Sequence, residues 1–250
     1  MHTLTDYLRD ADRILVFTGA GISTGSGIKD FRGPDGIWKS RKPVYYQDFM
    51  NSEAARIEHL DYKLETWDSF RHAQPNAVHH AIADLERAHK LLMVVTQNID
   101  GLHSVAGTSD ERLVEIHGTN RFIECQGCGE LTNPTPFFDA YRATRKPPVC
   151  ACGGWLKPAT ISFGQPLRES DLHRAAEAAH SADLVLALGS TLSVHPAASI
   201  PLMAAKRGIP YVIVNRGETD HDDLPQVTLR LEGDVADIVP AAVREASTHP

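Results

Sequence analysis

The stretch Ile14-Leu-Val-Phe-Thr-Gly-Ala-Gly-Ile-Ser23 is an apolar run that passes directly into a glycine-rich turn. A continuous apolar run of this length is typical of a strand that is covered on both faces. Glycines at positions 19 and 21 let the backbone approach a pyrophosphate, and successive N–H groups can hold its charge. The stretch therefore predicts the first strand and phosphate turn of a nucleotide-binding sheet.

The glycine turn alone is also compatible with a tight strand-to-helix connection, which selects glycine without any ligand. The usual dinucleotide fingerprint has a glycine three residues after Gly21, but that position is Thr24 and the next glycine is Gly25. Two later strand ends, Gly189-Ser190 and Asn215-Arg-Gly217, also carry small or amide residues. They favour a nucleotide, because ligands bind at the carboxyl ends of parallel strands.

Similar apolar runs recur along the chain, and helical patterns separate many of them. The predicted strands cover residues 14–17, 91–95, 113–116, 184–188, 211–214 and 227–231. The predicted helices cover residues 75–85, 172–180, 196–206 and 235–243. Strands that alternate with helices indicate an α/β fold with a doubly wound, mostly parallel sheet.

Two segments interrupt this alternation. Residues 31–73 lack a strong strand and are rich in aromatic and charged residues, and residues 118–159 hold all four cysteines. We interpret both as insertions that together form a second, smaller domain. The predicted nucleotide-binding domain comprises residues 1–30, 75–117 and 160–250, and the small domain comprises residues 31–74 and 118–159.

The overall charge restricts the possible partners. The 250 residues include 25 Lys and Arg against 32 Asp and Glu, a formal charge of −7. This balance argues against nucleic acid, which requires an excess of Lys and Arg, and is compatible with a basic peptide. No apolar stretch approaches the length of a membrane span, and the N-terminus lacks a signal-peptide block. We expect a cytoplasmic protein with no nucleic-acid or membrane partner. The oligomeric state stays open, and a monomer is compatible with the sequence.

The four cysteines form two closely spaced pairs, Cys125-x-x-Cys128 and Cys150-x-Cys152. Two such pairs of thiolates are the usual framework for a tetrahedral structural zinc ion. Disulfides are the alternative, but a reducing compartment disfavours them and adjacent pairs would be strained. The pattern predicts one structural Zn²⁺ that stabilises the small domain, and it leaves no cysteine as a nucleophile.

Polar residues follow two of the predicted strands directly. Thr96-Gln-Asn-Ile-Asp-Gly-Leu-His103 comes after the run 91–95, and His117-Gly118 comes after the run 113–116. A capped turn explains one Asn or Asp well, but it explains the whole set poorly. Imidazole titrates near neutral pH, which suits His117 to remove a proton from a hydroxyl group. We interpret His103 and His79 as structural.

The loop from Gly27 to Trp38 carries Asp30, Phe31 and Arg32 among several glycines. One interpretation is an Asp–Arg ion pair beside a core phenylalanine. The other is a mobile flap that closes on a cofactor, with Phe31 shielding a reactive carbon and Arg32 near ribose or phosphate.

Taken together, these motifs resemble the sirtuin family, in its compact bacterial-type core. The segments that carry the resemblance are GAGISTGSGIKDFRGPDGIW, TQNIDGLH, His117-Gly118, the four cysteines and GSTLSVHPA. It runs from Ile14 to about Val239, with the motifs in the expected order. It implies a Rossmann-like NAD domain and a small domain made of a helical module and a zinc ribbon. It also implies an NAD-dependent protein-lysine deacylase, most readily a deacetylase, that transfers the acyl group to ADP-ribose and releases nicotinamide.

The resemblance also implies roles for individual residues. His117 would be the base that acts on a ribose hydroxyl, with Asn98 and Asp100 as further catalytic residues. Asp100 and the Ile99 backbone would contact the nicotinamide carboxamide, and Gln97 and Asn98 the ribose and ordered water. The implied NAD-binding residues are Gly19, Ala20, Gly21, Ser23, Thr24, Asp30, Phe31, Arg32, Gln97, Asn98, Ile99, Asp100, His117, Gly189, Ser190, Asn215, Asp234 and Val235. Asp234 is equally explained as a helix N-terminal residue favoured by the helix dipole.

The segment Lys157–Gln165 resembles the part of the family that pairs with an extended acyl-lysine peptide as an added strand. The implied substrate-binding residues are Ile161, Phe163, Gly164 and Val194. A buried strand is an alternative for Ile161 and Phe163. Ala159 and Gln165 depart from the family pattern, which has a polar residue and Glu there, and the second cysteine pair is one residue shorter than the usual CxxC.

The residues of the helical module indicate which type of acyl group the protein removes. Family members that prefer succinyl or malonyl groups carry Tyr-x-x-Arg there, and the arginine neutralises the acyl carboxylate. Between Trp38 and Pro75 no tyrosine has this arginine, and Tyr62 is followed by Glu65. We therefore expect an uncharged acyl chain, with acetyl first.

Two other functions use the same residues. An NAD-cleaving ADP-ribosyltransferase or glycohydrolase would share the pocket without a productive acyl-lysine tunnel, and the departures at 159 and 165 keep it open. A non-enzymatic NAD sensor or interaction module is the third. The joint presence of Asn98, Asp100 and His117 argues against a sensor, which has no need of a base.

Overall fold

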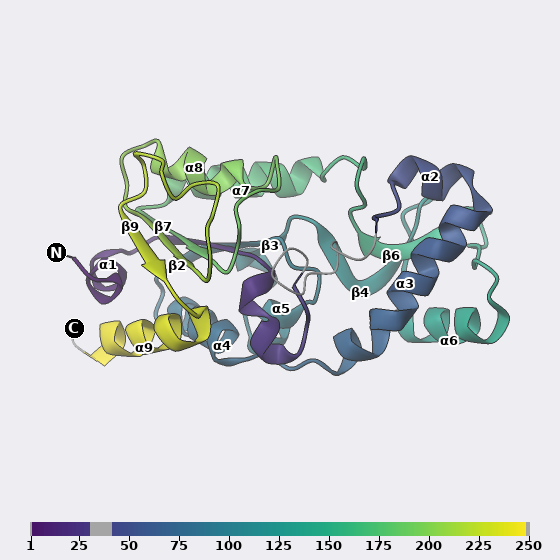
Figure 1. Cartoon of the computed structure of the whole chain (residues 1–250), viewed down its shortest axis with the longest axis horizontal. Helices are drawn as coiled ribbons and strands as arrows, with labels where there is room; N and C mark the ends of the chain where they lie inside the picture. Colours follow the sequence, from purple (N-terminus) through teal and green to yellow (C-terminus); the bar gives the residue numbers. More distant parts are fainter. Residues whose placement is uncertain (1, 31–41, 249–250) are drawn as a thin grey trace.

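The computed structural model describes residues 2–30 and 42–248. Figure 1 shows two unequal parts arranged along the long axis of the molecule. The larger part is built on a six-stranded sheet, and the smaller on a three-stranded sheet. Helices α1 (Leu4–Asp10) and α9 (Val235–Thr248) lie at the end of the molecule away from the smaller part.

The large sheet is parallel throughout, with the order β3-β2-β1-β7-β8-β9. This order reverses between β1 and β7, so the ligand crevice of such a fold lies outside the carboxyl ends of these two strands. The α/β, doubly wound class is confirmed, and each predicted strand lies within two residues of its expected bounds. The strands are β1 (Ile14–Thr18), β2 (Leu91–Thr96), β3 (Leu113–Glu115), β7 (Leu184–Leu188), β8 (Tyr211–Asn215) and β9 (Leu229–Glu232).

Helices cover both faces of this sheet, which explains the unbroken apolar runs. Helices α1, α4 (Ala77–Arg87) and α9 pack on one face, and α7 (Glu169–Ser181) and α8 (Ser199–Ala205) pack on the other. Every residue of β1, β7 and β8 is buried as a result. Asn76 caps α4, because its side-chain oxygen accepts a hydrogen bond from the Val78 N–H at 3.0 Å.

Short helical segments connect the strand ends to the site. They are η1 (Ala20–Ile22) and η2 (Thr24–Ser26) after β1, α5 (Leu102–Ala106) after β2, and η4 (Asp110–Arg112) before β3. None of the helices in the described ranges is both long enough and apolar enough to cross a membrane.

The smaller part combines an antiparallel sheet with three helices. The sheet has the order β5-β4-β6, with β4 (Gly118–Cys125), β5 (Leu131–Thr132) and β6 (Leu156–Thr160). The helices are α2 (Tyr46–Asn51), α3 (Glu53–His72) and α6 (Pro134–Thr144). Helices α3 and α6 form a separate core with β4, in which the rings of Trp67 and Phe138 stack with centroids 4.7 Å apart. The pattern of the sequence had not predicted β4, β6 or α6, and the exact domain bounds stay a prediction.

Candidate functional site

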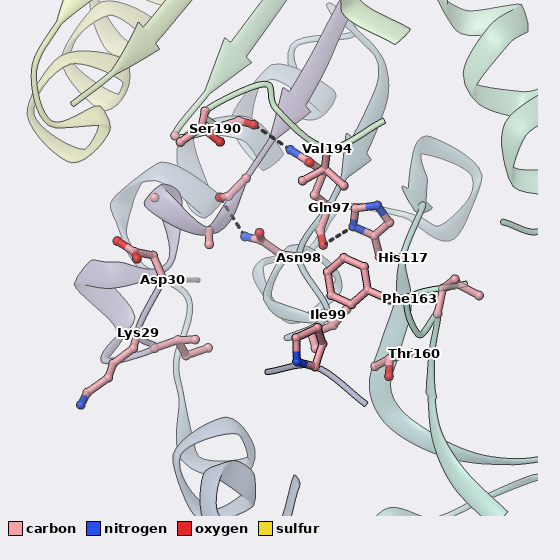
Figure 2. Close-up of a pocket in the computed structure, with 18 of the residues that line it drawn as sticks. Lys29, Asp30, Gln97, Asn98, Ile99, His117, Thr160, Phe163, Ser190 and Val194 are labelled. Atoms are coloured by element: carbon pink, nitrogen blue, oxygen red, sulfur yellow. Dashed lines mark hydrogen bonds between the residues drawn. The ribbon is translucent and has the colours of Figure 1, made fainter. Parts of the chain in front are cut away.

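A cavity of about 1100 Å³ lies where the two parts meet. The ends of β1, β2, β7 and β8 line one side of it, and the segment that follows β6 lines another. Figure 2 shows Ser190 at one end of this view and Thr160 at the other, with Asn98, Gln97 and His117 between them. The cavity thus occupies the crevice that the strand order predicts.

The glycines after β1 allow two strand ends to approach each other closely. The N–H groups of Gly19 and Gly21 donate to the carbonyls of Leu188 and Gly189 at 3.0 and 2.9 Å. A Cβ atom at Gly21 would lie 2.8 Å from the Gly189 oxygen. Gly19 and Gly21 line the cavity. Their two N–H groups are bonded within the protein, so the expected role of successive N–H groups in holding a pyrophosphate does not extend to them.

Replacing Gly189 with alanine should lower the free energy of unfolding by about 3 kcal/mol. Gly189 has φ +61°, and a Cβ atom there would lie 2.6 Å from the Ile22 nitrogen. Gly208→Ala is the matched control, because its φ is +83° but no atom lies within 4 Å. The control should cost only about 1–2 kcal/mol of backbone strain. Urea denaturation measures both, and equal losses would contradict the close packing at Gly189.

The residues after β2 are tied to the neighbouring strand ends by hydrogen bonds. The Gln97 side-chain amide donates to Ser190 Oγ at 2.7 Å, and the Gln97 N–H donates to the Thr18 carbonyl at 2.9 Å. The Asn98 side-chain amide donates to the Gly19 carbonyl and to Ser23 Oγ, both at 3.1 Å. Gln97 and Asn98 line the cavity, and only 4% of Asn98 is exposed. The amide groups therefore stand in fixed orientations.

Asp100 and Ser23 are bonded to each other and are not among the residues that line the cavity. The Ser23 hydroxyl donates to one Asp100 carboxylate oxygen at 2.7 Å, and the Leu102 N–H donates to the other at 2.9 Å. Burial raises the pKa of Asp100, and these two donors partly oppose that effect. Since Ser23 also accepts from Asn98, the pair supports the residue that lines the cavity.

His117 is held in one orientation by the backbone of the preceding strand. Its Nδ1 lies 3.1 Å from the Gln97 carbonyl oxygen, which can only accept, so Nδ1 carries the proton in this arrangement. The lone pair of the neutral ring is then on Nε2. The Ile161 N–H donates to the His117 carbonyl at 2.7 Å. This backbone bond joins His117 to the segment after β6, and His117 itself lines the cavity.

The four predicted substrate-binding residues, Ile161, Phe163, Gly164 and Val194, all line the cavity. Phe163 is 38% exposed, and its carbonyl accepts from the Tyr46 N–H at 2.8 Å. Phe163 and Val194 line the same cavity as His117, and Figure 2 draws the three side chains together. Gln165 closes the turn, because its side-chain oxygen accepts from the Ser162 N–H at 3.1 Å.

The remaining residues predicted to bind NAD fall into three groups. The first group lines the cavity and comprises Ala20, Thr24, Asp30, Ile99, Gly189, Ser190, Asn215, Asp234 and Val235. Asp234 also serves the helix, because its carboxylate accepts from the Ala236 N–H at 2.9 Å and pairs with Arg216 at 2.6 Å. Ser23 and Asp100 form the second group, which is not among the lining residues. The predicted residues Phe31 and Arg32 lie outside the described residues.

The four cysteine sulfurs lie within 4.8 Å of one another. The Sγ atoms of Cys125 and Cys152 are 3.5 Å apart, and those of Cys128 and Cys150 are 3.9 Å apart. A disulfide requires about 2 Å, whereas tetrahedral zinc with bonds of about 2.3 Å places its sulfurs roughly 3.8 Å apart. The cluster therefore fits one Zn²⁺, and the shorter Cys150-x-Cys152 spacing still reaches the site.

Backbone donors around the cysteines also fit thiolates. The Gly127 N–H points to Cys125 Sγ and the Gly154 N–H to Cys152 Sγ, each at 3.4 Å. These knuckles pack closely, since a Cβ atom at Gly154 would lie 2.6 Å from Cys125 Sγ. Hydrogen bonds from the backbone N–H groups of Cys128 and Gly127 lower the pKa of Cys125 to about 6. Such donors stabilise the charged sulfur that a metal needs.

The cavity residues that escaped the sequence prediction include His59, Tyr62 and Lys63 of α3. Lys63 directly follows Tyr62, and His59 lies one helical turn before it. His59 lies three residues before Tyr62 and four before Lys63, and this helical spacing was the signal that could have identified them.

Comparison with known proteins places the chain in a family. The model of the Sir2 family matches residues 19–196. Together with the parallel sheet, the crevice and the cysteine cluster, this match shows that the chain belongs to the Sir2, or sirtuin, family.

Similar proteins come from bacteria and archaea. An NAD-dependent protein deacetylase 1 of Bradyrhizobium diazoefficiens is 39% identical over 227 residues, covering 91% of this chain and 89% of that protein. An NAD-dependent protein deacetylase of Haloarcula marismortui is 38% identical over 247 residues, covering 97% and 93%. A solved structure of Sir2 with p53 peptide and NAD⁺ superposes with a TM-score of 0.86 at 32% identity, covering 97% of both chains.

Proposed function

We propose that the protein is an NAD-dependent protein-lysine deacylase that removes acetyl groups. One observation carries the proposal: a single cavity joins the crevice outside β1 and β7 to the segment after β6, with His117 at the junction. The proteins it resembles support the same activity, since the curated relatives are named NAD-dependent protein deacetylases. NAD is a co-substrate in this reaction, and an acyl-lysine peptide is the partner.

The proposed reaction balances as acyl-lysine plus NAD⁺ plus water giving lysine, nicotinamide and O-acyl-ADP-ribose. The ribose carbon exchanges its bond to nicotinamide for one to oxygen, and the acyl carbon exchanges its bond to the lysine nitrogen for one to a ribose oxygen. The amide oxygen is a weak nucleophile, so the protein must align it with the ribose and keep competing water away.

Each part of that task has residues suited to it. Asn98 and Gln97 present fixed amide groups to the ribose side of the cavity. The Nε2 atom of His117 takes the proton of a ribose hydroxyl, while the Gln97 carbonyl holds the ring at Nδ1. Phe163 and Val194 supply apolar walls beside this point. Asp100 acts through Ser23 and Asn98 as a positioning residue.

The zinc ion belongs to the fold of the smaller part in this proposal. Its four ligands are all protein thiolates, which leaves no open coordination position for a substrate. Four cysteines kept as thiolates suit a reducing compartment, and a cytoplasmic location is part of the proposal for that reason.

One assay tests the proposed function. The protein is incubated with NAD⁺ and an acetyl-lysine peptide, and peptide mass and nicotinamide release are followed together. We expect one nicotinamide per acetyl group removed. Release of nicotinamide without a change in the peptide would instead indicate an ADP-ribosyltransferase or glycohydrolase. Neither signal would indicate an NAD-binding module without catalysis.

A further inference from the structure

Arg56 is a buried arginine on α3 that is paired with no carboxylate. Only 6% of it is exposed, and none of the ion pairs among the described residues includes it. Its guanidinium carbon lies 3.7 Å from the centre of the Trp155 ring, which is a cation–π contact. A buried charge is costly unless its surroundings compensate it. The ring and the hydrogen-bond acceptors around Arg56 must supply that compensation.

The hydrogen-bond acceptors lie at the C-terminal end of α2. The Nη1 group of Arg56 donates to the carbonyls of Phe49 and Met50 at 2.8 and 3.0 Å. The last carbonyls of a helix have no partner within the helix and carry the negative end of its dipole, so a cation there satisfies both. Helix α2 has only six residues, which is too short for a stable isolated helix. Its position therefore depends on contacts such as those of Arg56.

The opposite end of α2 is bonded to the predicted substrate segment. The Tyr46 N–H donates to the Phe163 carbonyl at 2.8 Å, and the ring centroids of Tyr45 and Phe163 are 6.1 Å apart. Residues 42–44, which lead into α2, line the cavity, as Phe163 does. Arg56 is not among the lining residues, so any effect that it has on the cavity passes through its neighbours.

Trp155 is itself anchored by the backbone of the smaller part. It lies three residues after Cys152 and directly before β6, and its carbonyl accepts from the Gln126 N–H at 2.8 Å. Figure 1 shows α2, α3 and β6 together in the smaller part. Arginine suits the position between the ring and α2, because it offers a planar face to an aromatic ring and N–H groups along its edge. Arg56 thus joins an anchored ring to a helix that borders the substrate segment.

We propose that Arg56 is a positioning residue for the acyl-lysine peptide: it fixes α2 on Trp155, and α2 holds the segment around Phe163 ready for the peptide strand. This inference rests on the proposed deacylase function and adds to it a residue that does not touch the substrate. Without Arg56 the segment has to be ordered when the peptide binds, which weakens peptide binding. NAD⁺ binding is spared, because the strand ends of the nucleotide crevice are bonded to one another in the larger part.

The test measures the two ligands separately. Arg56→Met keeps an unbranched side chain without the charge or the donors, and it should raise KM for an acetyl-lysine peptide at least about tenfold. The dissociation constant of NAD⁺ alone, from titration calorimetry, should change by less than about threefold. A lower melting temperature with an unchanged peptide KM would overturn the proposal, as would equal weakening of both ligands. Failure of the unaltered protein to deacetylate the peptide would instead overturn the proposed function.

Arg207→Met is the matched control. Arg207 also donates from Nη1 to two carbonyls at the end of a helix, those of Ala179 and Ala182 at the end of α7, at 3.1 and 2.7 Å. It does not line the cavity, and its replacement should leave the peptide KM unaltered. A rise equal to that in Arg56→Met would show that the loss of any such helix contact has this effect, and it would overturn the specific role of Arg56.

A conservative variant keeps the proposal testable if Arg56→Met does not fold. Arg56→Lys retains the charge but has no planar group to stack on Trp155, so the peptide KM should rise by about three- to tenfold. An unaltered peptide KM in this variant would overturn the proposal. Trp155→Ala should also raise the peptide KM, and combining it with Arg56→Lys should add little, because both changes remove one contact. Additive rises would overturn the route through Trp155.

Discussion

Replacing His117 with alanine is expected to lower NAD-dependent deacetylation by roughly 10²- to 10⁴-fold. This corresponds to about 3–5 kcal/mol of lost transition-state stabilisation. The physical reason is that alanine has no group to accept the ribose proton. The Gln97 side chain, which also lines the cavity, is an amide already bonded to Ser190. Steady-state kcat/KM for an acetyl peptide measures the loss.

The fold should survive this substitution. The side chain of His117 is only partly buried. Its backbone carbonyl accepts a hydrogen bond from the Ile161 N–H, and any residue at position 117 keeps this bond. We expect a change in the melting temperature of no more than a few degrees. His173→Ala, an exposed histidine on α7, removes an imidazole elsewhere and should leave the rate unaltered. If His117→Ala kept the full rate, another group would have to be the base.

The sequence predicted the large sheet well because its physical signal is local. Strands covered on both faces must be apolar at every position, and β1, β7 and β8 are buried throughout. Where functional side chains follow a strand, the apolar run stops abruptly and polar residues take its place. For this reason Gln97, Asn98 and His117 could be singled out before their neighbours in space were known.

The smaller part was poorly predicted because its elements break the usual patterns. The buried face of α3 consists of Arg56, His59, Leu60, Lys63 and Trp67, which have helical spacing but are mostly polar. Helix α6 begins with Pro134. Proline is favourable at the first position of a helix, but in the sequence it resembled a loop signal. In both cases tertiary contacts, rather than hydrophobic periodicity, define the helix.

Within the site, the hydrogen-bond partners of individual side chains could not be predicted from the sequence either. That the Asp100 carboxylate accepts from Ser23 and Leu102 depends on the exact turn geometry, which spacing does not encode. The contacts of Lys63 on α3 with Asn120 of β4 and Thr160 of β6 depend on how these three elements pack together. Pairings between distant segments of this kind are determined by the packing of the whole chain.

Replacing Cys128 with alanine is expected to lower the free energy of unfolding by at least about 3 kcal/mol, although its side chain is exposed. For a chain of this size the melting temperature should fall by about 6–12 °C. Without a metal, an exposed thiol contributes almost nothing, and the same change would cost at most about 0.5 kcal/mol. Thr132→Ala, an exposed position on β5 of the same small sheet, is the matched control and should stay within that limit.

Chelation supplies the decisive comparison, because it removes the same interaction by another route. A chelator should lower the melting temperature of the unaltered protein and of Thr132→Ala by similar amounts, with loss of about one zinc per chain. It should have little further effect on Cys128→Ala, since two changes that abolish one interaction do not add. Additive losses would show that Cys128 stabilises the fold independently of the metal. A chelated protein that kept its melting temperature would show that the four sulfurs, though placed within 4.8 Å, do not hold zinc.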